Sequence, residues 1–272
     1  MPRAFLKARE PFSSYSHFIG AVLSGAGLFV LLVRLLFDPS VTGSLAAAAV
    51  VFCLSLIALY SASSVYHFSG RGEAVLRRLK KLDHSMIYVL IAGSYTPIIL
   101  KFMPAPRSYI FLGVIWLIAL TGIAIKLLWI DAPRLIGTAL YLALGWAIAF
   151  DFGVVLSMPA PAIALLAAGG LAYTVGGVIY IAKKPNLGLM IGFHELFHLF
   201  VIVGSVCHYL MVFLYVLSQT SRESSCGSRL VFVFIRTRQT IFITAMAEHS
   251  IIRILYPRMI RLCTIMIPYI FF

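Results

Sequence analysis

Runs of hydrophobic residues, each about 20 positions long, alternate with short polar or charged segments along most of the chain. Seven such runs occupy residues 18–37, 45–66, 86–102, 109–128, 135–157, 162–182 and 190–217. A helix needs about 20 mostly apolar residues to cross the hydrocarbon core of a bilayer. The segments between the runs carry turn and charge signals, such as the basic stretch 71–81. The pattern therefore predicts an all-α integral membrane protein folded as a seven-transmembrane helix bundle.

Composition supports a membrane protein over a soluble one. The chain is 61% hydrophobic and only 11% charged, whereas a soluble domain carries about 25% charged residues. The formal net charge of +13 would suggest a nucleic-acid partner in a soluble protein. Here the basic residues lie in short segments between apolar runs, so we expect membrane lipids as partners and no nucleic acid. The sequence does not define an oligomeric state.

The distribution of Lys and Arg predicts the direction of insertion, because these residues favour cytoplasmic loops. The alternate loops on one side contain Arg3, Lys7, Arg9, Arg71, Arg77, Arg78, Lys80, Lys81, Lys126, Arg134, Lys183 and Lys184. The loops on the other side contain only Arg34, Lys101 and Arg107. We therefore expect residues 1–17 to form a cytoplasmic amino-terminal segment ahead of a transmembrane domain over 18–217.

The last segment, residues 218–272, differs from the rest of the chain. It contains seven Arg and no Lys. Its apolar stretches are interrupted by Arg236, Arg238, Arg253, Arg258 and Arg261, so neither is typical of a transmembrane span. We interpret the segment as an atypical tail that is not an evolved part of the fold. A lineage-specific extension or an eighth, interfacial element is the alternative.

Ionisable residues at the helix ends indicate where chemistry takes place. His194 and His198 open the seventh run four positions apart, on one helical face. His67 closes the second run, with Ser63 one turn earlier, and Asp83 precedes the third. The predicted topology places His67, Asp83, His194 and His198 at one depth near the cytoplasmic face. Three imidazoles and a carboxylate are typical of a catalytic zinc site with three protein ligands and one open position. We predict His67, His194 and His198 as ligands, with Asp83 and Ser63 acting on water or substrate.

The remaining histidines of the runs have less specific surroundings. His17 lies at the cytoplasmic start of the first run and could support the site from outside the ligand set. His84 is expected to hydrogen-bond outside the cluster. His208 lies about 15 Å along the helix from His198, and we expect it to form a structural polar pair with Asp151.

The string HELFH at 194–198 also matches the zinc metalloprotease pattern, in which the Glu is the general base. Such an enzyme needs one further ligand, for which Asp83 is available. The third histidine at the same depth argues against this alternative.

Six segments of the chain together carry a specific resemblance. They are REPFSSYSH (9–17), SSVYH (63–67), KLDHSMIY (81–88), IAGSYTP (91–97), HELFH (194–198) and CHY (207–209). In this order, over residues 9–217, they resemble the bacterial haemolysin III family within the progestin and adipoQ receptor superfamily. The resemblance implies seven helices with a cytoplasmic amino terminus and zinc bound by His67, His194 and His198. It also implies that Asp83 bonds the zinc-bound water.

The resemblance implies a protein of the bacterial inner membrane and leaves several functions open. The first hypothesis is a zinc-dependent hydrolase of lipid amides, similar to a ceramidase. The alternatives are a pore-forming or cytolytic protein and a receptor-like sensor, both with structural zinc. A closed site with four protein ligands would favour a structural role, and an open position beside a cavity would favour hydrolysis.

Overall fold

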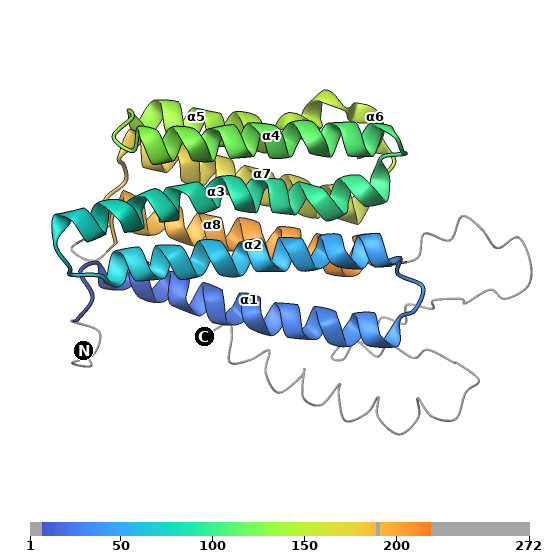
Figure 1. Ribbon diagram of the computed structural model, residues 1–272, viewed down its shortest axis with the longest axis horizontal. Helices are drawn as coiled ribbons and strands as arrows, with labels where there is room; N and C mark the ends of the chain where they lie inside the picture. The colour runs from blue at the N-terminus through green and yellow to red at the C-terminus, as the bar shows by residue number, and fades with distance from the viewer. Residues whose placement is uncertain (1–6, 189–190, 219–272) are drawn as a thin grey trace, which may run out of the picture. The chain divides into compact units, whose positions relative to one another are not determined.

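The computed structural model describes residues 7–188 and 191–218, and every regular element in this part of the chain is helical. The elements are α1 (Pro11–Phe37), α2 (Gly43–Phe68), α3 (Glu73–Phe102), α4 (Arg107–Leu128), α5 (Arg134–Gly145), the 3₁₀ helix η2 (Ala147–Phe150), α6 (Phe152–Leu156), α7 (Ala160–Ala182), α8 (Phe193–Met211) and the π-helical turn η3 (Val212–Val216). The long helices run side by side (Figure 1), and α1 contacts both α2 and α8. The predicted tail over 218–272 lies outside the described residues except for Ser218.

The described helices have the lengths and surfaces of a membrane bundle. Six of them, α1, α2, α3, α4, α7 and α8 with its η3 continuation, are long and apolar enough to cross a membrane. Many large hydrophobic side chains point outward, among them Phe29, Ile110, Leu117 and Leu171. An apolar outer surface of this extent is unfavourable in water and suits contact with lipid. The predicted all-α membrane fold is therefore confirmed.

The fifth predicted span, residues 135–157, is not one continuous helix. It consists of α5, η2 and α6, which follow one another alongside α4 (Figure 1). The break is stabilised by Tyr95 of α3, whose hydroxyl donates to the Gly145 carbonyl at 2.7 Å and accepts from the Ile148 N–H at 3.0 Å. Backbone groups freed inside a membrane need such partners, because lipid offers none. Asp151 then starts α6 by accepting from the Val154 N–H at 3.3 Å.

Two predicted boundaries are also corrected. The basic stretch 71–81, expected to be a connecting segment, is mostly helical because α3 begins at Glu73. Its Arg, Lys, Leu and Glu residues are good helix formers, so the helix continues beyond its apolar part. Similarly, α1 begins at Pro11, a residue type favoured in the first turn. This early start places Ser13, Ser14 and His17 on a helix, with all three side chains buried.

The three basic residues expected on the far side of the membrane all bind acceptors within the protein. Arg34 donates to the Phe213 carbonyl, Lys101 to the Ser218 carbonyl at 2.7 Å, and Arg107 pairs with Asp151. These three residues therefore link helices within the bundle. Their presence on the far side does not contradict the predicted direction of insertion.

Candidate metal centre and the adjoining cavity

The three predicted metal ligands converge in the folded chain. His67 comes from the last turn of α2, and His194 and His198 come from the first turns of α8. One nitrogen of each ring lies within 4.8 Å of the others, and the Nε2 atoms of His67 and His194 are 3.4 Å apart. His67 and His198 are buried and His194 is partly buried. Three imidazoles with this spacing could hold one metal ion.

Glu195, inside the HELFH string, has a structural role at the start of α8. Its carboxylate accepts from the Gly192 N–H at 3.0 Å and from the Ser13 hydroxyl at 3.1 Å. The first bond satisfies a free N–H group at the helix start, as in a capping box. The second ties α8 to α1. These contacts fix the helix turn that presents His194 and His198.

Glu10 is a functional candidate that the sequence reasoning missed. Its carboxylate contacts Nδ1 of His67, so the Nε2 atom of that ring faces the other two imidazoles. The backbone holds it there, because the Glu10 N–H donates to the His67 carbonyl at 3.0 Å and the Arg9 N–H donates to the Phe68 carbonyl at 3.3 Å. The hydrogen bond with His67 lowers the pKa of the Glu10 carboxyl below its ordinary value, against the opposing effect of partial burial. In the sequence, Glu10 stands out only as an acid eight positions before the first apolar run, within the segment 9–17 that carries part of the resemblance.

Asp83 and Ser63 lie beside the imidazoles without joining the ligand group. Both side chains are buried, and the Ser63 hydroxyl lies next to the Asp83 carboxylate. Oδ2 of Asp83 is 3.3 Å from Nδ1 of His84. The expectation that His84 bonds outside the predicted cluster is therefore wrong, because its ring pairs with the Asp83 carboxylate of that cluster.

His17 packs directly on the cluster. Its ring stacks on His198 with centroids 3.8 Å apart and planes inclined by 13°, and it meets Tyr60 edge-on at 5.0 Å. This buried ring fixes the plane of the His198 imidazole from the α1 side.

The expected pair between His208 and Asp151 is wrong. Asp151 pairs with Arg107, which reaches it from the start of α4, and it also caps α6. His208 instead faces the interior, where its ring meets Tyr173 edge-on at 5.3 Å. The break in the fifth segment explains the difference, because it directs Asp151 toward α4.

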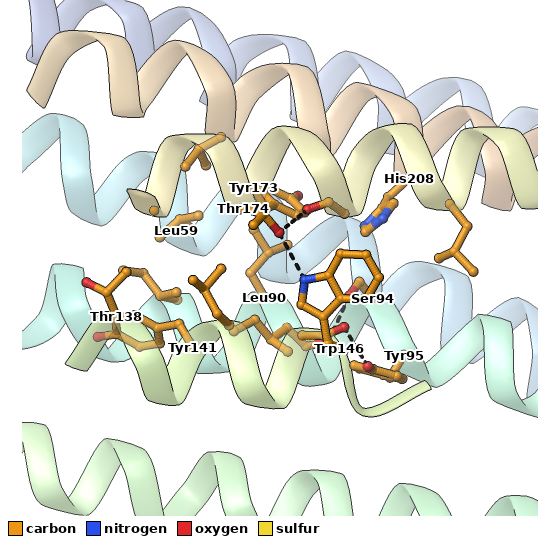
Figure 2. Close-up of a pocket in the computed structure, with 18 of the residues that line it drawn as sticks. Leu59, Leu90, Ser94, Tyr95, Thr138, Tyr141, Trp146, Tyr173, Thr174 and His208 are labelled. Carbon is orange, nitrogen blue, oxygen red and sulfur yellow. Dashed lines mark hydrogen bonds between the residues drawn. The ribbon is translucent and has the colours of Figure 1, made fainter. Parts of the chain in front are cut away.

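A cavity of about 340 Å³ adjoins the imidazoles. Its wall includes Ser63, Asp83, His194 and His198 at one end and His208 at the other. Most of the remaining lining is aliphatic or aromatic, including Leu59 and Leu90 from α2 and α3 (Figure 2). The arrangement thus combines a cluster of polar, ionisable groups with an apolar space.

The fold and the site define a multi-pass α-helical membrane protein with a buried three-histidine centre, and comparison with known proteins specifies its family. The family described as "Haemolysin-III related" matches residues 5–209, so the chain belongs to the haemolysin III family. It is 32% identical to Hemolysin-3 of Bacillus cereus over 210 residues, which cover 77% of this chain and 92% of that protein.

Other relatives extend the similarity. The chain is 33% identical to the Hemolysin-3 homolog of Bacillus subtilis (strain 168) over 166 residues, covering 61% of this chain and 75% of that protein. It is 28% identical to the human Monocyte to macrophage differentiation factor over 170 residues, covering 61% and 68% respectively. The predicted family is therefore confirmed, and the similarity to the human protein agrees with the wider superfamily.

Proposed function

We propose that this protein is a zinc-dependent hydrolase of lipid amides in the bacterial inner membrane. The observation that carries the proposal is that two histidines of the three-histidine cluster and the buried Asp83 carboxylate line one largely apolar cavity. A lipid amide has a polar bond to break and a hydrocarbon chain to bury. The site offers a place for each.

The residues of the cluster fit a zinc ion. Imidazole nitrogens are common zinc ligands, and a set of three with one open position is typical of catalytic sites. The Glu10 carboxylate on Nδ1 of His67 matches the carboxylate–histidine–metal arrangement that orients a ligand. Nδ1 of His198 is buried without a hydrogen-bond partner among the described residues, so this ring also has a nitrogen free for a ligand. A bound zinc ion would supply a Lewis acid that polarises a carbonyl and makes water more acidic.

The other residues have roles that follow from their positions. Asp83 would accept the proton of the attacking water and return it to the leaving amine, as a general base and then a general acid. Ser63 and His84 would hold the Asp83 carboxylate in place from either side. Glu10 would keep His67 in the tautomer whose Nε2 can bind metal. The apolar cavity would bind the acyl chain and exclude bulk water from it.

Asp83 also bears on the choice between a catalytic and a structural zinc. The group whose donor atoms converge comprises only the three histidines among the described residues. Asp83 is directed to His84 and the cavity. An open position beside a cavity supports hydrolysis over a zinc that only links helices.

A cytolytic function is the second candidate, because the bacterial relatives are named Hemolysin-3. The metalloprotease alternative has less support. The Glu195 carboxylate is engaged by Gly192 and Ser13, so it is not free to act as a general base.

The experiment is mass analysis of lipids after incubation of the detergent-purified, zinc-loaded protein with ceramides and N-acyl lipids. We expect release of a fatty acid and an amine by the parent protein. Release should be lost after zinc removal and in His194→Ala. Haemolysis by a protein that turns over none of these lipids would favour the second candidate.

A further inference from the structure

The far end of the cavity contains a fourth imidazole, that of His208. His208 and His198 both line the cavity and are ten positions apart on α8, which corresponds to about 15 Å along the helix axis. The ring is buried. Figure 2 shows it at the α7–α8 side of the cavity, near Tyr173 and opposite Tyr95 and Trp146.

The polar side chains near His208 in this cavity are already hydrogen-bonded within the protein. The pairs are Trp146 Nε1 with the Thr174 hydroxyl at 2.9 Å, the Tyr173 hydroxyl with the Ser205 hydroxyl at 2.9 Å, and the Ser94 hydroxyl with the Ile91 carbonyl at 2.8 Å. In contrast, neither nitrogen of His208 makes a hydrogen bond of normal geometry with any residue that the structure describes, although the Leu166 carbonyl lies nearby. His208 therefore has polar groups available for a ligand.

The His208 ring is held in this position by its neighbours. A Cβ atom at Gly169 would lie 2.5 Å from Cδ2 and 2.7 Å from Nε2 of the ring, so the missing side chain at Gly169 makes room for the imidazole. Tyr173 packs edge-on against the ring. An unpaired polar ring fixed in an apolar cavity is costly unless a ligand completes its hydrogen bonds.

We propose that His208 recognises a hydroxyl group on the hydrocarbon chain of the lipid ligand. A neutral imidazole has one donor and one acceptor, and a hydroxyl group also both donates and accepts. A chain that starts at the three histidines and spans about 15 Å would present roughly its twelfth carbon to His208, since each C–C bond of about 1.5 Å advances a zigzag chain by somewhat less. The inference rests on the proposed function and specifies its substrate class as lipids hydroxylated far along the acyl chain.

Binding of three fatty acids to the purified, zinc-loaded full-length protein tests this inference. The probes are dodecanoic acid, 2-hydroxydodecanoic acid and 12-hydroxydodecanoic acid, with affinities measured by isothermal titration calorimetry. We expect the 12-hydroxy acid to bind about tenfold more tightly than the other two, which is the order of one hydrogen bond gained in an apolar site. Equal affinities would show that water, and not a lipid hydroxyl, serves His208, and would overturn the inference.

Three variants test whether His208 causes the tighter binding of the 12-hydroxy acid. His208→Leu should bind the three acids equally, and His208→Gln should retain part of the preference because its amide keeps a donor and an acceptor. Thr174→Val is the matched control, because it removes a hydroxyl of the same cavity that is already bonded to Trp146; it should keep the preference. A preference that survives His208→Leu would overturn the inference. The binding assay needs no turnover, so its result is independent of hydrolysis. Hydrolysis of lipid amides without tighter binding of the 12-hydroxy acid would contradict only the role of His208. Tighter binding of the 12-hydroxy acid without hydrolysis would contradict only the proposed function.

Discussion

The Glu10 carboxylate contacts Nδ1 of His67 although 57 positions separate the two residues. The contact joins the segment before α1 to the end of α2. It leaves Nε2 of His67 facing His194 and His198. Glu10 therefore orients a ligand of the candidate metal centre.

The first prediction concerns this orientation. Glu10→Gln keeps the shape of the side chain but removes its charge, so His67 becomes a less basic and less well oriented ligand. We expect zinc affinity to fall by about 10–100-fold, as for other residues that orient metal ligands. Competition with a chelator of known affinity measures this. Glu73→Gln is the matched control, because it makes the same change at an exposed acid in the first turn of α3, and it should leave zinc affinity within a few-fold of the parent.

Glu10 also predicts a pH dependence of stability in the metal-free protein. In the folded state the pKa of Glu10 is lowered from 4.5 by its hydrogen bond with His67, so the ionised carboxylate stabilises the fold above that pH. The contribution is lost as the pH falls through the lowered value. The parent should melt at a higher temperature than Glu10→Gln at about pH 6, and the gap should shrink progressively as the pH falls below 4.5. A gap that is unchanged in acid would contradict this assignment.

Asp83→Asn separates a catalytic site from a structural one. If Asp83 acts on water, the variant should keep its zinc with a loss of at most about 10–100-fold in affinity. Hydrolysis should fall by about 10²–10⁴-fold, the usual contribution of a general base. Metal analysis, melting temperature and lipid-amide hydrolysis on this one variant decide the question. Joint loss of zinc and stability, with no activity in the parent, would identify Asp83 as a fourth ligand of a structural site.

Tyr95→Phe should destabilise the break between α5 and η2. Removal of the hydroxyl leaves the Ile148 N–H without its partner, and an unsatisfied buried donor costs about 1–3 kcal/mol. Thermal melting in detergent should show the lower stability. Tyr109→Phe is the control, because Tyr109 is exposed at the start of α4 and the same change there should leave the melting temperature nearly unaltered.

Deletion of residues 219–272 should leave membrane insertion and zinc content intact. The reasons are the exclusive use of Arg as the basic residue in this segment and its interrupted apolar runs. Ser218 is kept in this truncation because its carbonyl accepts from Lys101. Size-exclusion chromatography and metal analysis measure the result. Aggregation of the truncated protein would show that the tail belongs to the fold.

Hydrophobic run length predicted six of the long apolar helices and their order, because the bilayer imposes a minimum length on each helix. It could not predict that the segment over 135–157 is broken. The length of an apolar run reports only the average hydrophobicity of the segment. The break instead depends on hydrogen bonds from its backbone to Tyr95, which belongs to another helix. Helix starts at Pro11 and Glu73 were missed for a related reason, since α1 and α3 continue beyond their apolar parts.

The candidate site was predictable as far as spacing and depth allow. Two histidines four residues apart share a face in any helix, and the topology placed His67 at the same level. Partners of the histidines were less predictable. Glu10 contacts His67 only because the chain before α1 bonds to the end of α2, and His208 lacks Asp151 because Arg107 occupies that carboxylate.

The distance in sequence between the cluster's members has a consequence for biosynthesis. His194 follows His67 by 127 positions and belongs to α8, the last long helix described. During translation the ribosome must therefore deliver nearly the whole helical domain before the third imidazole becomes available. A nascent chain that stalls, or that inserts α8 in the wrong orientation, cannot assemble the centre. The three-histidine centre therefore forms only in molecules whose described helical domain has been made and inserted through α8.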